Sequence, residues 1–442
     1  MSDYANAKIV SYNAYGERVC AAAAKISTTV GNAYELIDAS SDSESCHKLI
    51  GKVLSSGHSS VIEHATFSLA LRDVSVYVEQ FFIEHRLASF TVKSRRYVNF
   101  NEQGYYIPPE LDGEDRAFYC EYMDALFKAY SLLLDGGIPR EDARFILPYS
   151  LCSNFYCTVN ARELVHIIAE MEAKGARMTE LASLARQLKE QLLALFPSLE
   201  KHLTSLEGTW SKNTAPAAHC PLGELTLVDA EHSGGAELIS APCNPDALIS
   251  ACGAVSPEAL IKSARPRALE LLNYAFNIRD ITLSGITHLA RHRMQTLFVP
   301  ELDDISLDRV IVPDSVRENA AMLKVYTEAA VSAHEKLKAH ENSTVFAAYR
   351  RYFALSGTLT DVVSSMNARE LLLFTQLRCC NRAQWEIRHI ATTMLSLLRE
   401  SYPALFDLMG PSCCIMGYCP EGRLTCGEME KVIARFGESK LV

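Results

Sequence analysis

The sequence predicts an α+β protein built from two tandem copies of one domain, each with a mostly antiparallel sheet and long helices. Three polar landmarks recur at one spacing through otherwise unlike sequence. They are His85-Arg86 with His292-Arg293, Arg144 with Arg351, and the run NAREL at 160–164 with NAREL at 367–371, and each pair is 207 positions apart (292 − 85, 351 − 144, 367 − 160). Chance matches would drift in register, so we infer a duplication.

Composition supports two globular domains and limits the classes of partner. A chain of 442 residues is long enough for two substantial cores, and its 48% hydrophobic and 22% charged residues are ordinary for a globular protein. The net charge of −10 argues against a broad nucleic-acid surface. The 14 cysteines, without a signal pattern or a long apolar run, indicate reduced thiols in a cytoplasmic protein that has no membrane partner.

The two halves are expected to contain the same order of elements. In the first half the patterns predict a helix at 46–57, a strand at 61–71, a helix at 73–89 carrying His85 and Arg86, and helices at 114–134, 160–172 and 178–195. In the second half they predict a strand at 269–278 and helices at 279–293, 315–338, 367–379 and 383–399. We therefore expect domains at 1–206 and 225–410, a Gly- and Pro-containing linker at 207–224, and a Cys-rich tail at 411–442.

The start of each copy aligns at a different spacing. The stretch KIVSYNAYGERV at 8–19 best matches LTLVDAEHSGGAEL at 225–238, an offset near 218. The second copy is therefore expected to have lost about eleven residues ahead of its His-Arg pair.

Two basic segments are candidates for ligand binding. Asn367, Leu371, Phe374 and Arg378 share one helical face, which suits either a planar ring with a polar edge or a core face with polar ends. If the triplet 291–293 lies on a helix, its residues splay by about 100° each and can serve two ligands. It can equally be a solvated basic turn at a helix C-terminus. The loop expected at 89–97, rich in hydroxyls and cations, is a candidate phosphate cradle without the glycines of a P-loop.

Several of these segments together resemble one family. They are HSSVIEH (58–64), EHRLASFTVKSRRYV (84–98), YYIP (105–108), ARFILP (143–148), NAREL (160–164), RHR (291–293) and NARELLLFTQLRCCNRAQWEIR (367–388), and they are similar to motifs of the flavin-dependent thymidylate synthases, the ThyX family. The resemblance implies an α/β subunit of a homotetramer with FAD at subunit junctions. It also implies reductive methylation of dUMP to dTMP, with methylenetetrahydrofolate and NADPH as co-substrates and no protein nucleophile.

The resemblance carries residue roles over to this chain. It implies substrate binding by Ser94, Arg96, His288, Arg291, Arg351 and Arg378, among which Ser94 and Arg378 are the catalytic candidates. It implies FAD binding by His58, Glu63, His85, Arg86, Asn160, Arg162, Arg291, His292, Arg293, Asn367 and Arg369. Arginines suit the task because they stabilise negative charge that develops on the pyrimidine in a dry site.

Each copy departs from the family pattern where the other keeps it. The first copy has Glu84 for the first arginine of RHR, Met171 at the position of Arg378, and 177–179 in place of Gln-Trp-Glu at 384–386. The second has Glu301 and Asp303 in place of Ser94 and Arg96, and it lacks the His-rich segment. We infer a fused pseudo-dimer in which Ser94 and Arg96 work with Arg291, Arg351 and Arg378, and in which the acidic residues exclude phosphate from the reciprocal site. Two chains would form a homodimer that acts as a pseudo-tetramer.

Other departures leave the substrate open. Thr91, Val92 and His288 stand where the family usually has Asn, Glu and Gln. These changes are compatible with flavin-dependent methylation of another pyrimidine nucleotide. They are also compatible with a catalytically silent relative that binds FAD or a nucleotide.

The cysteine tail lies outside these motifs. Cys413, Cys414, Cys419 and Cys426 have irregular spacing for a zinc site, and Cys379 and Cys380 could join them only if the fold brings them close. Structural thiols, a structural zinc and a redox or iron–sulfur role all remain interpretations, and we expect no metal centre.

Overall fold

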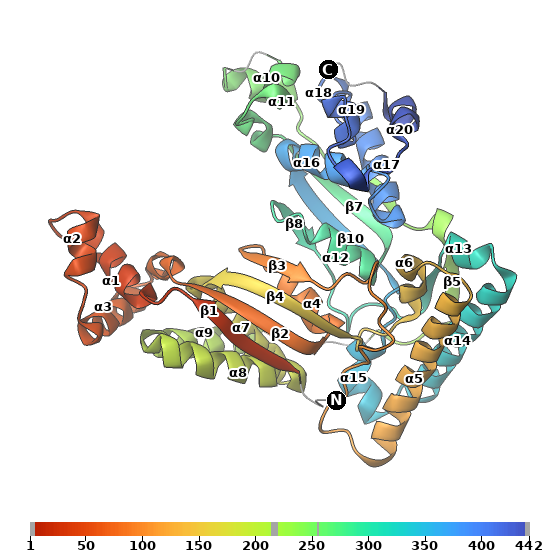
Figure 1. Cartoon of the computed structure of the whole chain (residues 1–442), viewed down its shortest axis with the longest axis horizontal. Coiled ribbons are helices and arrows are strands. Elements are labelled where there is room, and N and C mark those ends of the chain that lie inside the picture. The colour runs from red at the N-terminus through yellow and green to blue at the C-terminus, as the bar shows by residue number, and fades with distance from the viewer. Residues whose placement is uncertain (1–4, 214–219, 254–255, 438–442) are drawn as a thin grey trace. The chain divides into compact units, whose positions relative to one another are not determined.

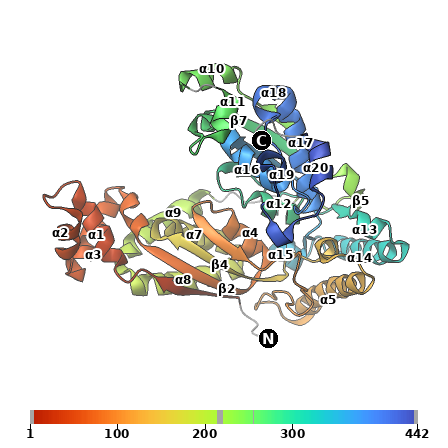
Figure 2. The same cartoon turned by 45° about the horizontal axis from the view of Figure 1, so that its top comes forward.

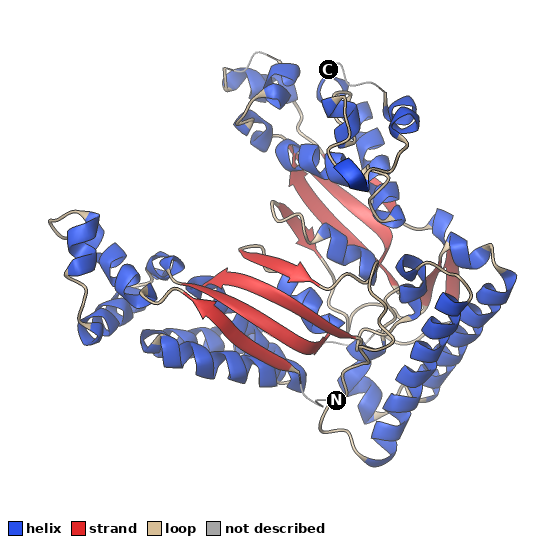
Figure 3. Ribbon diagram, viewed as in Figure 1, coloured by secondary structure: helices blue, strands red, loops and turns tan. Residues whose placement is uncertain are grey.

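A computed structural model describes residues 5–213, 220–253 and 256–437, which form two compact units. Unit 1 comprises Met1–Ser131, Leu147–His219 and Glu335–Ala354, and unit 2 comprises Leu132–Ile146, Cys220–His334 and Leu355–Val442. Helices and antiparallel sheets confirm the α+β expectation (Figure 3). No helix among the described residues is both long and apolar enough to cross a bilayer.

Unit 1 is built on a four-stranded antiparallel sheet. The strands are β1 (Asn6–Tyr12), β2 (Thr66–Ser75), β3 (Ala88–Val92) and β4 (Cys152–Asn160), in the order β1-β2-β4-β3. Helices α7 (Ala161–Gly175) and α8 (Thr179–Leu195) lie along the sheet (Figure 1) and bury their leucine and isoleucine faces. Further helices of this unit are α1 (Gly16–Ile26), α2 (Ala33–Asp38), α3 (Ser43–Ser55), α4 (Val76–Ile83), α9 (Glu200–Asn213) and α15 (Thr344–Phe353), with 3-10 turns at 59–64 and 197–199.

Unit 2 repeats this sheet and adds a parallel strand pair. The sheet strands are β6 (Gly235–Ser240), β7 (Asn273–Thr282), β8 (Gln295–Phe298) and β10 (Leu359–Asn367), in the order β6-β7-β10-β8, and β5 (Thr226–Asp229) pairs in parallel with β9 (Arg309–Val312). Its helices are α6 (Arg140–Ala143), α10 (Pro245–Ala251), α11 (Pro257–Lys262), α12 (Leu283–Leu289), α13 (Asp314–Arg317), α16 (Ala368–Arg378), α17 (Trp385–Ser401), α18 (Pro403–Phe406), α19 (Ser412–Met416) and α20 (Met429–Phe436). Helices α16, α17, α19 and α20 lie together in both views (Figures 1 and 2).

Strand register confirms the duplication and corrects its N-terminal alignment. Leu71 of β2 pairs with Ala7, and the equivalent Ile278 of β7 pairs with Ala236. Ala7 and Ala236 are 229 positions apart (236 − 7), so the second copy is 22 residues shorter here (229 − 207). The expected offset near 218 and the loss of about eleven residues were wrong. The matched stretch begins with β5, which pairs with β9 in place of β7.

The two copies exchange one segment each. In unit 1, the second copy's α15 segment is held by the backbone N–H of Tyr149, which donates to the carbonyl of Ala354 at 2.8 Å. In unit 2, the N–H of Gly357 donates to the carbonyl of the first copy's Phe145 at 2.8 Å. The connecting helices α5 (Gly113–Asp135) and α14 (Ala320–Ala339) each begin in one unit and end in the other. Arg351 therefore belongs to unit 1, and Arg144 belongs to unit 2.

Most predicted long helices are confirmed to within a few residues, but the helices at 73–89 and 279–293 were wrong. Strand β2 continues to Ser75, whose hydroxyl accepts the N–H of Val78 and begins α4, and this helix ends at Ile83. In the same way Thr282 caps α12, which ends at Leu289. The His-Arg motifs therefore lie in turns after short helices. The predicted strands at 61–71 and 269–278 begin instead as 3-10 turns.

The segment expected as a linker at 207–224 is occupied by α9 up to Asn213. Residues 214–219 lie outside the described residues.

Candidate functional site

Arg378 is held in unit 2 by a buried histidine. Its Nε donates to Nε2 of His292 at 2.8 Å, and its Nη2 donates to the carbonyl of His288 at 3.4 Å. The other ring nitrogen, Nδ1 of His292, lies 2.9 Å from the Glu370 carboxylate. Because a guanidinium can only donate hydrogen bonds, Nε2 of His292 must accept one from Arg378. The ring proton therefore lies on Nδ1, which donates a hydrogen bond to the Glu370 carboxylate. The hydrogen bonds from Arg378 to His292 and from His292 to Glu370 therefore orient the guanidinium at the end of α16.

The charges and burial around His292 favour its neutral imidazole. Burial lowers the pKa of His292, the hydrogen bond and charge of Glu370 oppose that effect, and the nearby charge of Arg378 lowers the pKa further. The ring also meets Phe374 edge-on, with ring centroids 4.9 Å apart. A neutral ring can accept the Arg378 hydrogen bond, and a protonated ring cannot.

The first copy uses its equivalent histidine differently. Nδ1 of His85 lies 2.9 Å from the carbonyl of Phe81, and Nε2 lies 3.4 Å from a carboxylate oxygen of Glu170. Burial alone would lower the pKa of His85, but the Glu170 hydrogen bond and charge outweigh it and raise the pKa. Met171, at the position of Arg378, cannot donate to the ring. The Nε2 atom of His85 thus faces a carboxylate, whereas the Nε2 atom of His292 faces a guanidinium.

The loop predicted at 89–97 is partly strand, since β3 extends to Val92. The Ser94–Arg96 segment lies in the turn that follows β3. The hydroxyl of Ser94 accepts the N–H of Arg96 at 3.3 Å, and the Arg96 guanidinium lies over the Tyr97 ring, 5.4 Å from its centroid. Between them, buried Arg95 forms an ion pair with buried Glu79 at 3.2 Å. This pair anchors the turn and leaves Ser94 and Arg96 partly exposed. Arg95 and Glu79 were not predicted as site residues from the sequence.

Arg351 lies in the same unit as that turn. It is buried, and its guanidinium lies 5.8 Å from the centroid of the Tyr77 ring on α4. Arg144, in unit 2, donates from Nε to the carbonyl of Glu141 at 3.0 Å and lies over the Phe145 ring. Unit 1 therefore contains Ser94, Arg96 and Arg351, whereas unit 2 contains the predicted residues His288, Arg291, His292, Arg293 and Arg378.

The RHR turn of unit 2 alternates in exposure. His292 is buried, and Arg291 and Arg293 are exposed on either side of it. This turn replaces the expected helix, so helical splay does not account for the exposure of the two arginines on either side of His292. Both guanidiniums can reach an anionic ligand from the surface. In the first copy Arg86 is exposed as well.

The NAREL segments have structural roles that repeat in both copies. The side chains of Asn160 and Asn367 cap α7 and α16 by accepting an N–H at 2.9 Å in each case. Arg162 forms an ion pair with Glu63 at 2.6 Å, and Arg369 forms one with Glu270. Glu270 lies 207 positions after Glu63, so the second copy retains this glutamate although the histidines of the segment are gone. His58, just before the turn that carries Glu63, is exposed. The FAD roles of these residues remain predictions.

Two fully buried glutamates also repeat. Glu180 accepts the N–H and the hydroxyl of Ser75, both at 2.7 Å. Glu386 accepts the N–H and the hydroxyl of Thr282, at 2.6 and 2.7 Å. Burial raises the pKa of each carboxyl to about 7.

These glutamates correct one inferred loss. Glu386 belongs to the Gln-Trp-Glu motif, and Glu180 performs the same task 206 positions earlier (386 − 180). The first copy therefore keeps the glutamate. The equivalence was missed because the spacing between the NAREL run and this glutamate is one residue shorter in the second copy than in the first. The two glutamates therefore do not align at the offset of 207.

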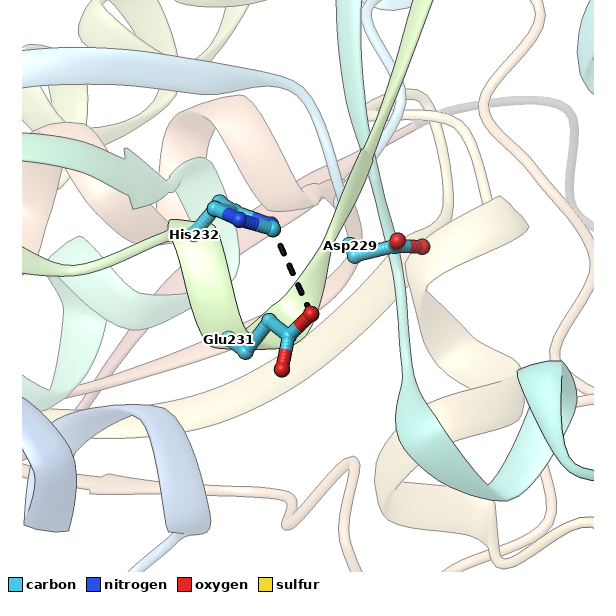
Figure 4. Close-up of side chains that lie close together, drawn as sticks. All are labelled: Asp229, Glu231 and His232. Carbon is cyan, nitrogen blue, oxygen red and sulfur yellow. Dashed lines mark ion pairs between the residues drawn. The ribbon is translucent and has the colours of Figure 1, made fainter.

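Potential metal ligands gather at a different place from the cysteine tail. In the part of the chain that the structure describes, Asp229, Glu231 and His232 have ligand atoms within 4.8 Å of one another (Figure 4). Arg317 lies 3.6 Å from Asp229 and 3.5 Å from Glu231, so a guanidinium already forms ion pairs with both carboxylates of this group. The tail thiols of Cys413, Cys414, Cys419 and Cys426 are free and form no such group among the described residues.

Unit 1 also has a cavity of about 250 Å³ beside the start of α1. Its lining includes Tyr12, Tyr15, Arg18, Ser40 and Phe196, and it contains none of the predicted site residues.

Comparisons with known proteins match both halves of the chain. The family model described as thymidylate synthase complementing protein matches residues 8–198 and 250–404. A relative named flavin-dependent thymidylate synthase, from Geobacter sulfurreducens, is 35% identical over 179 residues, which cover 39% of this chain and 76% of the relative. Another of the same name, from Clostridium tetani, is 29% identical over 237 residues, covering 50% of this chain and 91% of the relative. A solved UMP/dUMP methylase, PolB from Streptomyces cacaoi, bound with 5-Br dUMP, is 25% identical, covers 46% of this chain and 95% of its own, and superimposes with a TM-score of 0.40.

Proposed function

Because the chain belongs to the family of thymidylate synthase complementing proteins, we propose that it catalyses flavin-dependent reductive methylation of dUMP to dTMP. Methylenetetrahydrofolate supplies the one-carbon unit, and NADPH reduces the FAD. Relatives named flavin-dependent thymidylate synthase support an enzymatic methyltransferase. No protein nucleophile is required, so this chain's own residues bind, orient and polarise the reactants.

The donor set of the RHR turn fits a flavin nucleotide. Arg291 and Arg293 are exposed guanidiniums on one short turn, and planar guanidinium forks suit the pyrophosphate of FAD. They are the residues that would hold the cofactor. When bound, FAD supplies the hydride that the methylation consumes.

The substrate residues that survive form a complementary set. The single observation that carries the composite site is that the second copy's Arg351 belongs to the same unit as the first copy's Ser94 and Arg96. The other candidate, Arg378, keeps its neutral acceptor His292 only in the second copy, because methionine occupies the equivalent position of the first. We propose that one working site draws on residues retained by both copies.

These residues have distinct tasks in the proposed reaction. The hydroxyl of Ser94 and the guanidinium of Arg96 bind the phosphate of dUMP, and Arg351 adds a second cation for the same anion. Arg378 stabilises the negative charge that develops on the pyrimidine when its ring is activated. His292 keeps this guanidinium fixed, so little reorganisation is needed as the charge appears.

The test is a titration of purified protein with dUMP, followed by the flavin absorption spectrum, with the bound flavin counted per chain. We expect about one flavin per chain and a dUMP-dependent spectral shift, since one of the two duplicated sites retains its ligands. A protein that takes up no flavin when FAD is added would refute the proposal. Running UMP beside dUMP separates thymidylate synthesis from methylation of another pyrimidine nucleotide.

Subunit mixing tests the composite site and the proposed homodimer. Arg96→Ala and Arg378→Ala each remove one member of the set, and we expect both variants to be inactive alone. If the two residues serve one site across chains, mixed dimers recover part of the activity. Arg186→Ala is a useful control, because it removes an exposed ion pair with Glu190 on α8 of the first copy and leaves all the proposed site residues intact. Full activity in the separate Arg96 and Arg378 variants would rule out the shared site.

A further inference from the structure

The α15 segment, which the second copy contributes to unit 1, is held by a hydrogen bond at the residue next to Arg351. Tyr352, the residue after Arg351, is buried, and its hydroxyl donates to Oε2 of Glu180 at 2.7 Å. The ring of Tyr352 also meets the ring of Tyr106, with centroids 5.6 Å apart. Burial holds the pKa of Tyr352 well above its usual range, so the hydroxyl stays protonated and remains a donor.

Glu180 connects this tyrosine to the helix beneath Arg351. The same carboxylate accepts the N–H and hydroxyl of Ser75, the residue whose side chain caps α4. Tyr77, on the first turn of α4, carries the ring under the Arg351 guanidinium. One carboxylate thus joins the segment that carries Arg351 to the helix that supports its guanidinium.

The equivalent place in unit 2 lacks this connection. The counterpart of Tyr352 is Phe145 (352 − 207), which has no hydroxyl and meets the Trp385 ring edge-on with centroids 6.1 Å apart. Glu386 accepts two hydrogen bonds from Thr282, and Phe145 cannot donate a further one as Tyr352 does to Glu180. The tyrosine stands in the unit that retains Ser94 and Arg96, and the phenylalanine stands in the unit where Glu301 and Asp303 replace them.

We propose that Tyr352 and Glu180 are positioning residues that hold the exchanged Arg351 in place for the substrate phosphate. The proposal rests on the proposed function for the identity of the substrate. The hydrogen bonds of Glu180 with Tyr352 and Ser75 do not depend on the reaction, because they form within unit 1 without a ligand. The hydroxyl of Tyr352 acts through Arg351 and does not touch the reactants.

The first test is a thermodynamic cycle that uses dUMP as the probe. Tyr352→Phe removes one hydroxyl, and we expect the Kd for dUMP to rise between about twofold and about tenfold, the effect of losing one buried hydrogen bond. In an Arg351→Ala background the same change should have no further effect, because there is no guanidinium left to position. Tyr326→Phe is the matched control, since it removes a buried tyrosine hydroxyl that donates to the carbonyl of Ile311 in unit 2. An equal rise in Kd in both backgrounds would overturn the proposal.

The second test needs no ligand, so failure of the proposed function cannot obscure it. Amide hydrogen exchange of the free protein reports the opening of α15, the helix that contains Arg351 and Tyr352. We expect faster exchange there in Tyr352→Phe and in Glu180→Gln, and unchanged exchange in Tyr326→Phe. Glu180→Gln also covers the case in which the tyrosine variant does not fold. Unchanged protection of α15 in both variants would refute the positioning role even if dUMP binds as proposed.

Discussion

Replacing Glu386 by glutamine should remove most of a pH dependence in the unfolding of unit 2. Burial raises the pKa of this carboxyl from 4.5 to about 7. Between these two values the folded state binds more protons than the unfolded state, so the free energy of unfolding falls as pH rises through this window and levels off above it. A shift of this size, at 1.36 kcal/mol per unit, corresponds to roughly 3 kcal/mol. Glutamine does not ionise and can still accept the N–H of Thr282.

The assay is urea unfolding at about pH 5 and about pH 8, two values that span most of the window between the unfolded-state and folded-state pKa values of this carboxyl. The chain has two tryptophans, and one of them, Trp385, precedes Glu386, so fluorescence in a Trp210→Phe background reports on unit 2. Burial also raises the pKa of Asp142, which titrates in the same direction in both proteins. The difference between them therefore isolates Glu386. Equal losses of stability with rising pH in the parent and in Glu386→Gln would show that this carboxyl does not titrate as its burial requires.

Two further substitutions test the site and its support. His292→Phe removes the acceptor of the Arg378 guanidinium, whose proposed role is to stabilise charge that develops during the reaction, so we expect kcat with dUMP to fall about tenfold in steady-state kinetics. His334→Phe, at another buried histidine of unit 2, should leave this kcat unchanged. Gly285→Ala would place a Cβ 2.8 Å from a buried carboxylate oxygen and should lower stability in thermal unfolding by about 1–3 kcal/mol. Gly51→Ala meets nothing within 4 Å on its helix and should stabilise slightly, so a similar result for both glycines would contradict the steric argument.

The sequence predicted the duplication, the fold class and the long amphipathic helices because each has a visible periodicity or spacing. It misplaced the short helices α4 and α12 for a physical reason. All residues of α4, from Val76 to Ile83, are buried, so the alternation of polar and apolar faces that marks a helix boundary is absent. The strand ahead of it is buried at its end as well, so the transition from strand to helix leaves no signal in hydrophobicity.

The candidate site was predicted in part. The shared face of α16 correctly indicated that Arg378 lies beside an apolar strip, and the structure adds His292 as its partner. The buried glutamates were missed because a single-residue difference between the copies conceals the equivalence of Glu180 and Glu386. The segment exchange was not predictable from the sequence either, since both copies keep the same order of elements and only tertiary packing decides which unit each segment joins.

Both copies keep an arginine at this position, and the proposed site uses only Arg351. Arg144 belongs to the unit with Glu301 and Asp303, and its charge opposes part of the effect of burial, which raises the pKa of Glu386. We therefore expect Arg144 to act on stability, whereas Arg351 belongs to the unit with Ser94 and Arg96.

The two arginines should accordingly fail in different ways when each is replaced by alanine. Arg144→Ala removes a charge that favours ionised Glu386 and leaves the two hydrogen bonds from Thr282, so we expect unit 2 to lose up to about 1 kcal/mol at a pH above the carboxyl's pKa and less below it. Arg351→Ala should weaken dUMP binding and leave that pH dependence unchanged. Urea unfolding and dUMP titration of both variants measure the two effects side by side. If Arg144→Ala weakened dUMP binding as much as Arg351→Ala, the assignment of the arginines to different tasks would be wrong.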